Sequence, residues 1–267
     1  MSITEKYVIV DRRLLMEIAV QGLKTAYDET GEGAPLLLLH GWGVERSVFA
    51  PLQQYFSQHM RVYSFDFPGF GASAEPPAVW GVADYADFTQ AFCQAVGLGN
   101  PCLLGHSFGG RVAIHLASRG FGAKLVLTDA AGLRPKRSLA YYLRVYSYKA
   151  AKKVLYLPGL RRWREQALSL WLKCNPSSDY ARAQGIMRAI FVKVVNEDLA
   201  ALLPRIQQST LLMWGEKDRE TPLADGQRME KLIPGAGLVV CKGAGHYPFL
   251  EQPAYFYRVL ESFFNLA

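Results

Sequence analysis

A serine in a glycine-rich pentapeptide has the sequence setting of a catalytic nucleophile. Residues 105–109 read Gly-His-Ser-Phe-Gly and match the Gly-x-Ser-x-Gly pattern of a nucleophile elbow. The match alone would also fit an ordinary glycine-rich turn. However, a short apolar run at 102–104 precedes it, and a helical stretch starting near Gly110 follows. Such a strand–turn–helix unit exposes the serine hydroxyl, so Ser107 is the predicted nucleophile.

An acyl-transfer nucleophile needs N–H donors for the oxyanion that develops in the transition state. The backbone N–H of Phe108 stands at the start of the helix, where the helix dipole also favours negative charge. A second glycine-rich loop, His-Gly-Trp-Gly at 40–43, follows another apolar run. It would also fit a plain strand-to-helix connection, but beside the elbow it offers the N–H of Trp42. We therefore predict an oxyanion hole formed by Trp42 and Phe108.

The base that activates the serine is expected late in the chain. His246 lies in the segment Gly-Ala-Gly-His-Tyr-Pro at 243–248, directly after the last apolar run. His40 and His106 lie inside the two glycine motifs, where structural hydrogen bonding is the expected role. His246 is therefore the predicted general base.

Two of four nearby carboxylates, Asp218 and Asp129, compete to orient that base. Asp218 ends the segment Trp-Gly-Glu-Lys-Asp at 214–218 and is the preferred candidate. Asp129 follows an earlier apolar run and could also reach the histidine, so it remains an alternative. Asp66, in a Pro-Gly-rich loop, is expected to shape that loop, and Glu216 is expected to be solvated. The three residues follow one another along the chain as serine, aspartate and histidine, the order expected of a hydrolytic triad on a parallel α/β sheet.

The elements that must position these residues form a repeating pattern. Short apolar runs of the kind found in strands buried on both faces alternate with helical stretches such as 84–96 and 111–118. This predicts an α/β fold with a mostly parallel central sheet and helices on both faces. Ligands bind at the carboxyl ends of such strands, where the candidate residues stand. The predicted strands are 16–20, 23–27, 35–39, 61–65, 102–104, 125–127, 211–214 and 238–240.

One segment interrupts the alternation. Residues 132–205 contain no convincing strand, and amphipathic helical spacing recurs over Arg137–Leu157 and around Trp163–Trp171. We expect a helical cap at 132–205, inserted between a first core part at 1–131 and a second at 206–267.

The net charge of +7 is concentrated in this insertion. Residues 131–205 carry 15 Lys and Arg against 4 Asp and Glu, whereas the rest of the chain carries 15 against 19. This charge fits a solvated face or a docking face for an anionic partner, such as an acyl carrier protein or an acidic lipid surface. No nucleic-acid recognition motif accompanies it, so no nucleic-acid partner is predicted.

Length and composition bound the remaining possibilities. The chain has 267 residues, of which 50% are hydrophobic, and no apolar run is long enough to span a bilayer. The four cysteines (Cys93, Cys102, Cys174 and Cys241) are widely spaced, which predicts reduced thiols rather than a disulfide framework or a zinc site. With no secretory signal, a cytoplasmic protein without cofactor or metal is expected. The oligomeric state stays open.

These motifs together resemble the α/β-hydrolase family over about Glu17 to Phe264. The resemblance implies a serine hydrolase with the triad Ser107, Asp218 and His246. Serine in place of an aspartate nucleophile argues against haloalkane dehalogenases and epoxide hydrolases. The loop at 40–43 and the basic cap are also similar to the methyl ester esterases that act on pimeloyl carrier protein. The matching segments are 40–43, 66–73, 105–110, 214–218 and 243–246.

The resulting hypothesis is hydrolysis of a small-molecule carboxylic ester with an apolar acyl group, through an acyl-enzyme on Ser107. The same triad could instead cleave a carbon–carbon bond or a small amide or peptide. A ligand-binding receptor of hydrolase fold is the non-enzymatic alternative, against which a complete triad argues.

Overall fold

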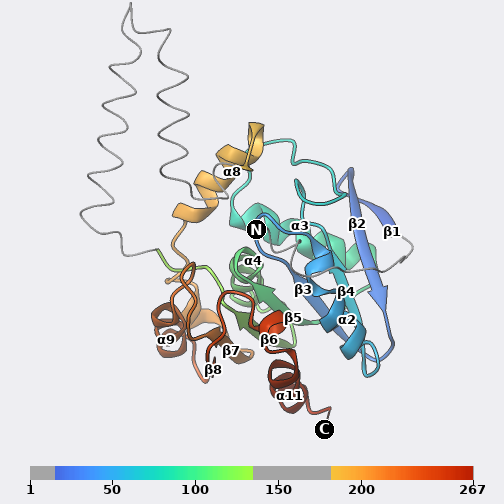
Figure 1. Cartoon of the computed structure of the whole chain (residues 1–267). Helices are drawn as coiled ribbons and strands as arrows, with labels where there is room; N and C mark the ends of the chain where they lie inside the picture. Colours follow the sequence, from blue (N-terminus) through green and yellow to red (C-terminus); the bar gives the residue numbers. More distant parts are fainter. Residues whose placement is uncertain (1–15, 135–181, 267) are drawn as a thin grey trace, which may run out of the picture.

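A computed structural model of the chain describes residues 16–134 and 182–266. Eight strands form one sheet with the order β1-β2-β4-β3-β5-β6-β7-β8 (Figure 1). The pairs β1–β2 and β2–β4 are antiparallel, and all other neighbours are parallel. The strands are β1 (Met16–Val20), β2 (Leu23–Thr30), β3 (Ala34–Leu39), β4 (Met60–Phe65), β5 (Cys102–His106), β6 (Lys124–Thr128), β7 (Ser209–Gly215) and β8 (Gly237–Cys241).

Helices pack on both faces of this sheet. Alternation along β3 explains why both faces are apolar, since Leu37 and Leu39 join one core cluster while Leu36 and Leu38 join the other. The first face is covered by α3 (Val82–Ala95), α4 (Phe108–Ala117) and α9 (Leu223–Leu232), and the second by α2 (Ala50–Phe56), α10 (Pro248–Glu251) and α11 (Pro253–Phe264). Short 3-10 turns form η1 (Arg46–Phe49) and η3 (Leu203–Arg205).

The last helix illustrates how local sequence sets these elements. Pro253 occupies the first turn of α11, where its missing N–H costs nothing. Phe256, Leu260 and Phe264 recur every four residues and are buried against the sheet. Asn265 ends the helix in the left-handed conformation, with a φ of 60°. The apolar stripe and the residues at the two ends therefore indicate the same helix, α11.

The predicted α/β fold is confirmed. Each expected apolar run is the centre of an observed strand, although most strands extend one to three residues further; β5, for example, runs to His106 instead of ending at Leu104. The helix expected to start near Gly110 begins at Phe108.

The predicted cap lies only partly within the described residues. Its expected helices at Arg137–Leu157 and Trp163–Trp171 fall outside them. The described portion contains α8 (Gly185–Asn196), which stands beyond α4 at the edge of the fold (Figure 1). Ile190 and Val194 of α8 are buried and belong to the same core cluster as α3 and α4.

The cysteines and the helix lengths bear on the predictions made from composition. Cys93, Cys102 and Cys241 are free thiols, and Cys174 lies outside the described residues. Among the helices of residues 16–134 and 182–266, none has the length and apolarity required to cross a bilayer.

Candidate active site

Ser107 occupies a strained turn between β5 and α4. Its φ is 50° and its ψ is −112°, a conformation that L-residues rarely adopt. The turn is possible because glycines flank it: a Cβ added to Gly109 would lie 2.0 Å from the carbonyl oxygen of Leu39. The carbonyl of Ser107 accepts N–H groups from Gly110 and Ala131, each at 3.0 Å. The strand–turn–helix geometry expected of a nucleophile elbow is therefore present.

The glycine loop at 40–43 lies against this turn. A Cβ added to Gly41 would lie 3.4 Å from Cβ of Ser107. The rings of Trp42 and Phe108 meet edge to face, with centroids 5.4 Å apart, and both residues line the same cavity as Ser107. The two residues predicted to form the oxyanion hole are thus brought to the nucleophile, and the use of their N–H groups stays a prediction.

His40 and His106 hold these loops in place by hydrogen bonds. Nδ1 of His40 donates to the carbonyl of Gly41 at 2.7 Å, while its Nε2 accepts the N–H of Phe67 at 3.0 Å. Nε2 of His106 donates to the carbonyl of His246 at 2.8 Å. Burial lowers the pKa of both imidazoles, which favours the neutral rings that these bonds require.

His246 and Asp218 form the central hydrogen bond of the site. Nδ1 of His246 lies 2.7 Å from Oδ2 of Asp218, and both side chains are buried. Burial alone would raise the pKa of Asp218, but hydrogen bonding and charge interaction with His246 outweigh it, and the pKa is lowered to about 2. Asp218 is therefore a carboxylate at neutral pH that orients the ring and fixes its Nδ1–H tautomer.

Thr221 completes the surroundings of that carboxylate and was not predicted from the sequence. Its hydroxyl donates to Oδ2 of Asp218 at 2.7 Å, and its N–H lies 3.2 Å from Oδ1. The N–H of Glu220 donates to the same Oδ1 at 2.8 Å. The spacing Asp-x-x-Thr at 218–221 was the available signal, since such short polar turns bind their own backbone.

Asp129, the alternative acid, lies behind Asp218 and not against the ring. It is fully buried, with Oδ1 accepting the N–H of Gly215 at 2.9 Å and Oδ2 accepting the hydroxyl of Thr128 at 3.0 Å. Burial raises its pKa well above the usual value, and its interaction with Asp218 adds to this rise. The protonated form of Asp129 is therefore favoured beside the ionised Asp218.

The other two acids stand apart from the ring. Asp66 is fully buried and accepts the N–H groups of Arg46 at 2.8 Å and Ala72 at 2.9 Å, which shapes the loop after β4. Glu216 is exposed and accepts the N–H of Gly243 at 2.9 Å.

Asp129, Asp218 and His246 are also the group whose donor atoms could converge on a metal ion, since these atoms all lie within 4.8 Å of one another. However, Nδ1 of His246 is already hydrogen-bonded to Asp218, and the raised pKa of Asp129 favours the protonated form of its carboxyl. A metal would have to displace both protons, because ligands bind deprotonated. The cluster fits a proton-linked acid–base chain better.

A cavity of about 530 Å³ opens over Ser107. Glu220 and Thr221, which both contact His246, line it as well. Most of the lining is apolar, with Arg111 as a buried cation. The lining residues are Trp42, Ser107, Phe108, Arg111, Ala131, Leu133, Phe191, Val194, Val195, Arg219, Glu220, Thr221, Pro222, Ala224, Asp225 and Arg228.

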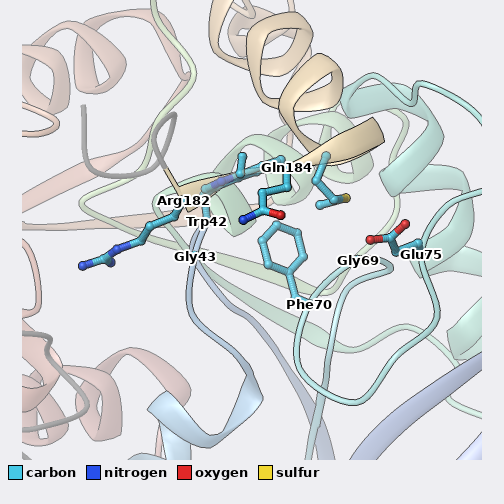
Figure 2. A pocket seen from close by; sticks show the side chains of 9 residues that line it. Trp42, Gly43, Gly69, Phe70, Glu75, Arg182 and Gln184 are labelled. Atoms are coloured by element: carbon cyan, nitrogen blue, oxygen red, sulfur yellow. The ribbon is translucent and has the colours of Figure 1, made fainter. Parts of the chain in front are cut away.

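A second cavity of about 290 Å³ lies beside the first, and Trp42 lines both. Figure 2 shows its lining side chains, among them Phe70, Glu75 and Gln184. Met187 of α8 also borders it, whereas Phe191 one turn later borders the larger cavity.

The comparison with known families decides the identity of this arrangement. A profile of the alpha/beta hydrolase family matches residues 36–259, which include every residue of the candidate site. The chain belongs to the α/β-hydrolase family.

Relatives of this α/β hydrolase include proteins named as esterases. It is 27% identical over 248 residues to the pimeloyl-[acyl-carrier protein] methyl ester esterase of Nitrosomonas europaea. The matched region covers 86% of this chain and 95% of the relative. Among solved structures, it resembles the esterase EaEST of Exiguobacterium antarcticum with a TM-score of 0.72 and 25% identity, over 94% of this chain and 99% of that one. It also resembles a bacterial membrane phospholipase A with a TM-score of 0.74 and 25% identity, over 94% and 86% of the two chains.

Proposed function

We propose that this α/β hydrolase cleaves carboxylic esters through an acyl-enzyme on Ser107, with His246 as general base and Asp218 as the acid that orients it. The observation that carries the proposal is the 2.7 Å bond between Asp218 and Nδ1 of His246, beside a cavity that also contains the strained Ser107. The bond leaves Nε2 as the ring nitrogen available to accept a proton.

The reaction has two steps. His246 removes the hydroxyl proton of Ser107, whose oxygen attacks the ester carbonyl, and the N–H groups of Trp42 and Phe108 stabilise the oxyanion. Collapse of this intermediate breaks the bond to the alcohol, which leaves with the proton from His246. Water, activated by the same ring, then attacks the acyl-enzyme and releases the acid with regeneration of Ser107. Asp218 stays ionised throughout and stabilises the imidazolium.

The cavity walls support an apolar acyl group. Phe108, Leu133, Phe191 and Val194 border the space over Ser107 and would bury a hydrocarbon chain. Apolar area removed from water contributes roughly 25 cal/mol per Å², so even a short chain gains binding free energy here. The names of the relatives, two of which are esterases, point to the same bond class.

A carrier-bound substrate is the finer version of this proposal. The first relative acts on an acyl-carrier-protein ester according to its name, and residues 131–205 of this chain are strongly basic. In the described part of that segment, Arg182, Arg188 and Lys193 are exposed. We propose that this segment, 132–205, is a cap that docks an anionic partner, either an acyl carrier protein or an acidic lipid surface. If so, raising the salt concentration will slow hydrolysis of a carrier-bound ester and leave a small free ester unaffected. Equal rates on the carrier-bound ester at low and high salt would refute the docking.

The proposed function is tested with a series of p-nitrophenyl esters of increasing acyl length, beside matched amides and a vinylogous diketone. We expect the esters to be the preferred substrates, and Ser107→Ala to lower kcat by at least about 10³-fold. Ser118→Ala is a suitable control, since Ser118 caps the end of α4 and its hydroxyl donates to the backbone carbonyl of His115 at 2.9 Å. Normal esterase activity in Ser107→Ala, or preference for the amide or diketone, would contradict the proposal.

A further inference from the structure

Arg111 is a buried cation in the wall of the cavity that contains Ser107. Its residue exposure is 4%, and it follows the serine by four positions on α4. Ser107 precedes the first turn of α4, and both residues line the cavity of about 530 Å³. Arg111 therefore borders the same space as the nucleophile.

The described neighbours of Arg111 leave its charge largely uncompensated. Its Nη1 donates to the backbone carbonyl of Glu197 at 2.8 Å, and this is its one hydrogen bond to residues 16–134 and 182–266. The carboxylate of Glu197 is engaged elsewhere, because it accepts the N–H of Val82 at 3.1 Å. Asp198 likewise accepts the N–H of Ala200 at 3.1 Å. Glu197 and Asp198 thus act on Arg111 only through charge at a distance, and no ion pair joins either of them to it among the described residues.

Burial of such a group is costly. A guanidinium has five N–H donors, and a buried charge without a bonded counter-charge destabilises the folded state. Burial lowers the pKa of Arg111 to about 10, against the opposing effect of Glu197 and Asp198, so the group remains a cation at neutral pH. If Arg111 served only to hold α4 against the end of α8, the single bond to the Glu197 carbonyl would be enough. Arg111 also lines the cavity, so the bond to Glu197 leaves guanidinium donors for a bound anion.

The other two arginines in the lining differ from Arg111. Arg219 is exposed, and Arg228, whose side chain is 40% exposed, lies 3.6 Å from Asp225. Water therefore screens the charge of Arg219, and water and Asp225 together screen that of Arg228. An anion bound at Arg111 would instead be held in apolar surroundings, where charge interactions are stronger.

We propose that the acyl half of the substrate ends in a carboxylate that binds Arg111, so that the preferred esters are half-esters of dicarboxylic acids. This inference rests on the proposed ester hydrolysis at Ser107 and adds the substrate class. An adipate half-ester, in which about five bonds of roughly 1.2 Å each separate the two carbonyl carbons, is a suitable probe of this class. The apolar walls then bury the methylene groups between the two ends.

The kinetic test compares mono-p-nitrophenyl adipate with p-nitrophenyl hexanoate, which has the same chain length and no charge. A hydrogen-bonded charge contributes enough for roughly a ten- to hundredfold effect. We therefore expect kcat/KM to favour the charged ester in the native protein. Arg111→Gln should lower kcat/KM by at least about tenfold for the charged ester, mainly through KM, and by less than about threefold for hexanoate. Arg111→Lys should restore part of the preference, whereas a purely structural role would affect both esters equally.

A binding measurement keeps the inference testable without turnover. Calorimetric titration of Ser107→Ala with monomethyl adipate and with methyl hexanoate should show tighter binding of the charged ester, and adding Arg111→Gln should abolish that difference. Arg228→Gln serves as the matched control and should retain it. Equal affinity for the two esters, or equal losses in both, would overturn the role of Arg111. Neutral-ester hydrolysis that depends on Ser107 would still support the proposed function in that case, whereas absent hydrolysis with intact charge-selective binding would contradict the proposed function alone.

Discussion

The carboxylate of Glu220 lies 3.3 Å from Nε2 of His246. This is the opposite ring nitrogen to the one bonded by Asp218 at 2.7 Å, so the imidazole stands between two acids. Nε2 is the atom that must take the proton of Ser107 in the proposed reaction. Glu220 therefore competes with the serine for the base. Its side chain is 66% exposed, which makes the competition weak and easily displaced by a substrate.

Replacing Glu220 with glutamine should therefore increase the reactivity of Ser107. Exposed ion pairs contribute up to about 1 kcal/mol, so the expected gain is at most about fivefold. The rate of labelling by a fluorophosphonate measures it directly. Glu216→Gln is the control, because Glu216 is an exposed acid on the same loop that binds the N–H of Gly243. A slower reaction in Glu220→Gln would mean that this acid assists the base.

The two buried aspartates should differ sharply in their effect on catalysis. Asp218→Asn removes the acceptor of the Nδ1 proton and should lower kcat by about 10³- to 10⁴-fold. Asp129→Asn keeps an acceptor for the N–H of Gly215 and a donor toward Asp218, so kcat should stay within about tenfold. Steady-state kinetics on one ester separates the two cases. Losses of similar size would make Asp129 a working member of the triad.

Asp129 should also make stability depend on pH. Because burial raises its pKa well above the unfolded value, the folded chain holds a proton that the unfolded chain releases. This contribution to stability is complete below the unfolded pKa of about 3.9 and falls as the pH rises toward the folded pKa. Asp129→Asn removes that fall, so its stability relative to the native protein should increase as the pH rises above about 4.

Urea denaturation at several pH values measures this difference. Asp218 has the opposite sign, since its pKa of about 2 favours folding above the unfolded pKa and that gain is lost as the pH falls toward 2. Asp218→Asn should therefore reduce stability at neutral pH. A difference between Asp129→Asn and the native protein that does not change with pH would contradict the neutral state of Asp129.

Close packing of two loops should make Gly215 intolerant of a side chain. A Cβ at this position would lie 1.9 Å from the carbonyl oxygen of Gly245, next to His246. Gly215→Ala should therefore destabilise the fold by about 1–3 kcal/mol and reduce activity, because the loop that carries the base must move. Gly237→Ala is the matched control in β8, since nothing lies within 4 Å of its added Cβ. Thermal denaturation and kcat of both variants give the comparison.

The sequence was informative where one short segment determines one local structure. Continuous apolar runs predicted the parallel strands because a strand buried on both faces has no polar side, as β3 illustrates. The glycine pattern around Ser107 predicted the strained turn because only residues without a Cβ allow β5 and α4 to approach so closely. Both kinds of signal depend on neighbours in the chain.

Relationships between distant segments could not be predicted in the same way. The contact between Glu220 and His246 depends on how two loops cross the sheet edge, which no local pattern records. Arg111 fits equally well on any amphipathic helix, and only the path of the chain after α8 brings its one described partner, the Glu197 carbonyl, beside it. The choice between Asp129 and Asp218 also depended on three-dimensional distance, because both follow buried strands.

Helix α8 borders both cavities, and Trp42 lines each of them. Met187 faces the smaller one, while Phe191, Val194 and Val195 face the larger. Side chains that lie four or more positions apart on α8 thus line different cavities. Protein engineers could therefore reshape the smaller cavity through Met187 and the larger one through Phe191 or Val195, since these side chains border different spaces.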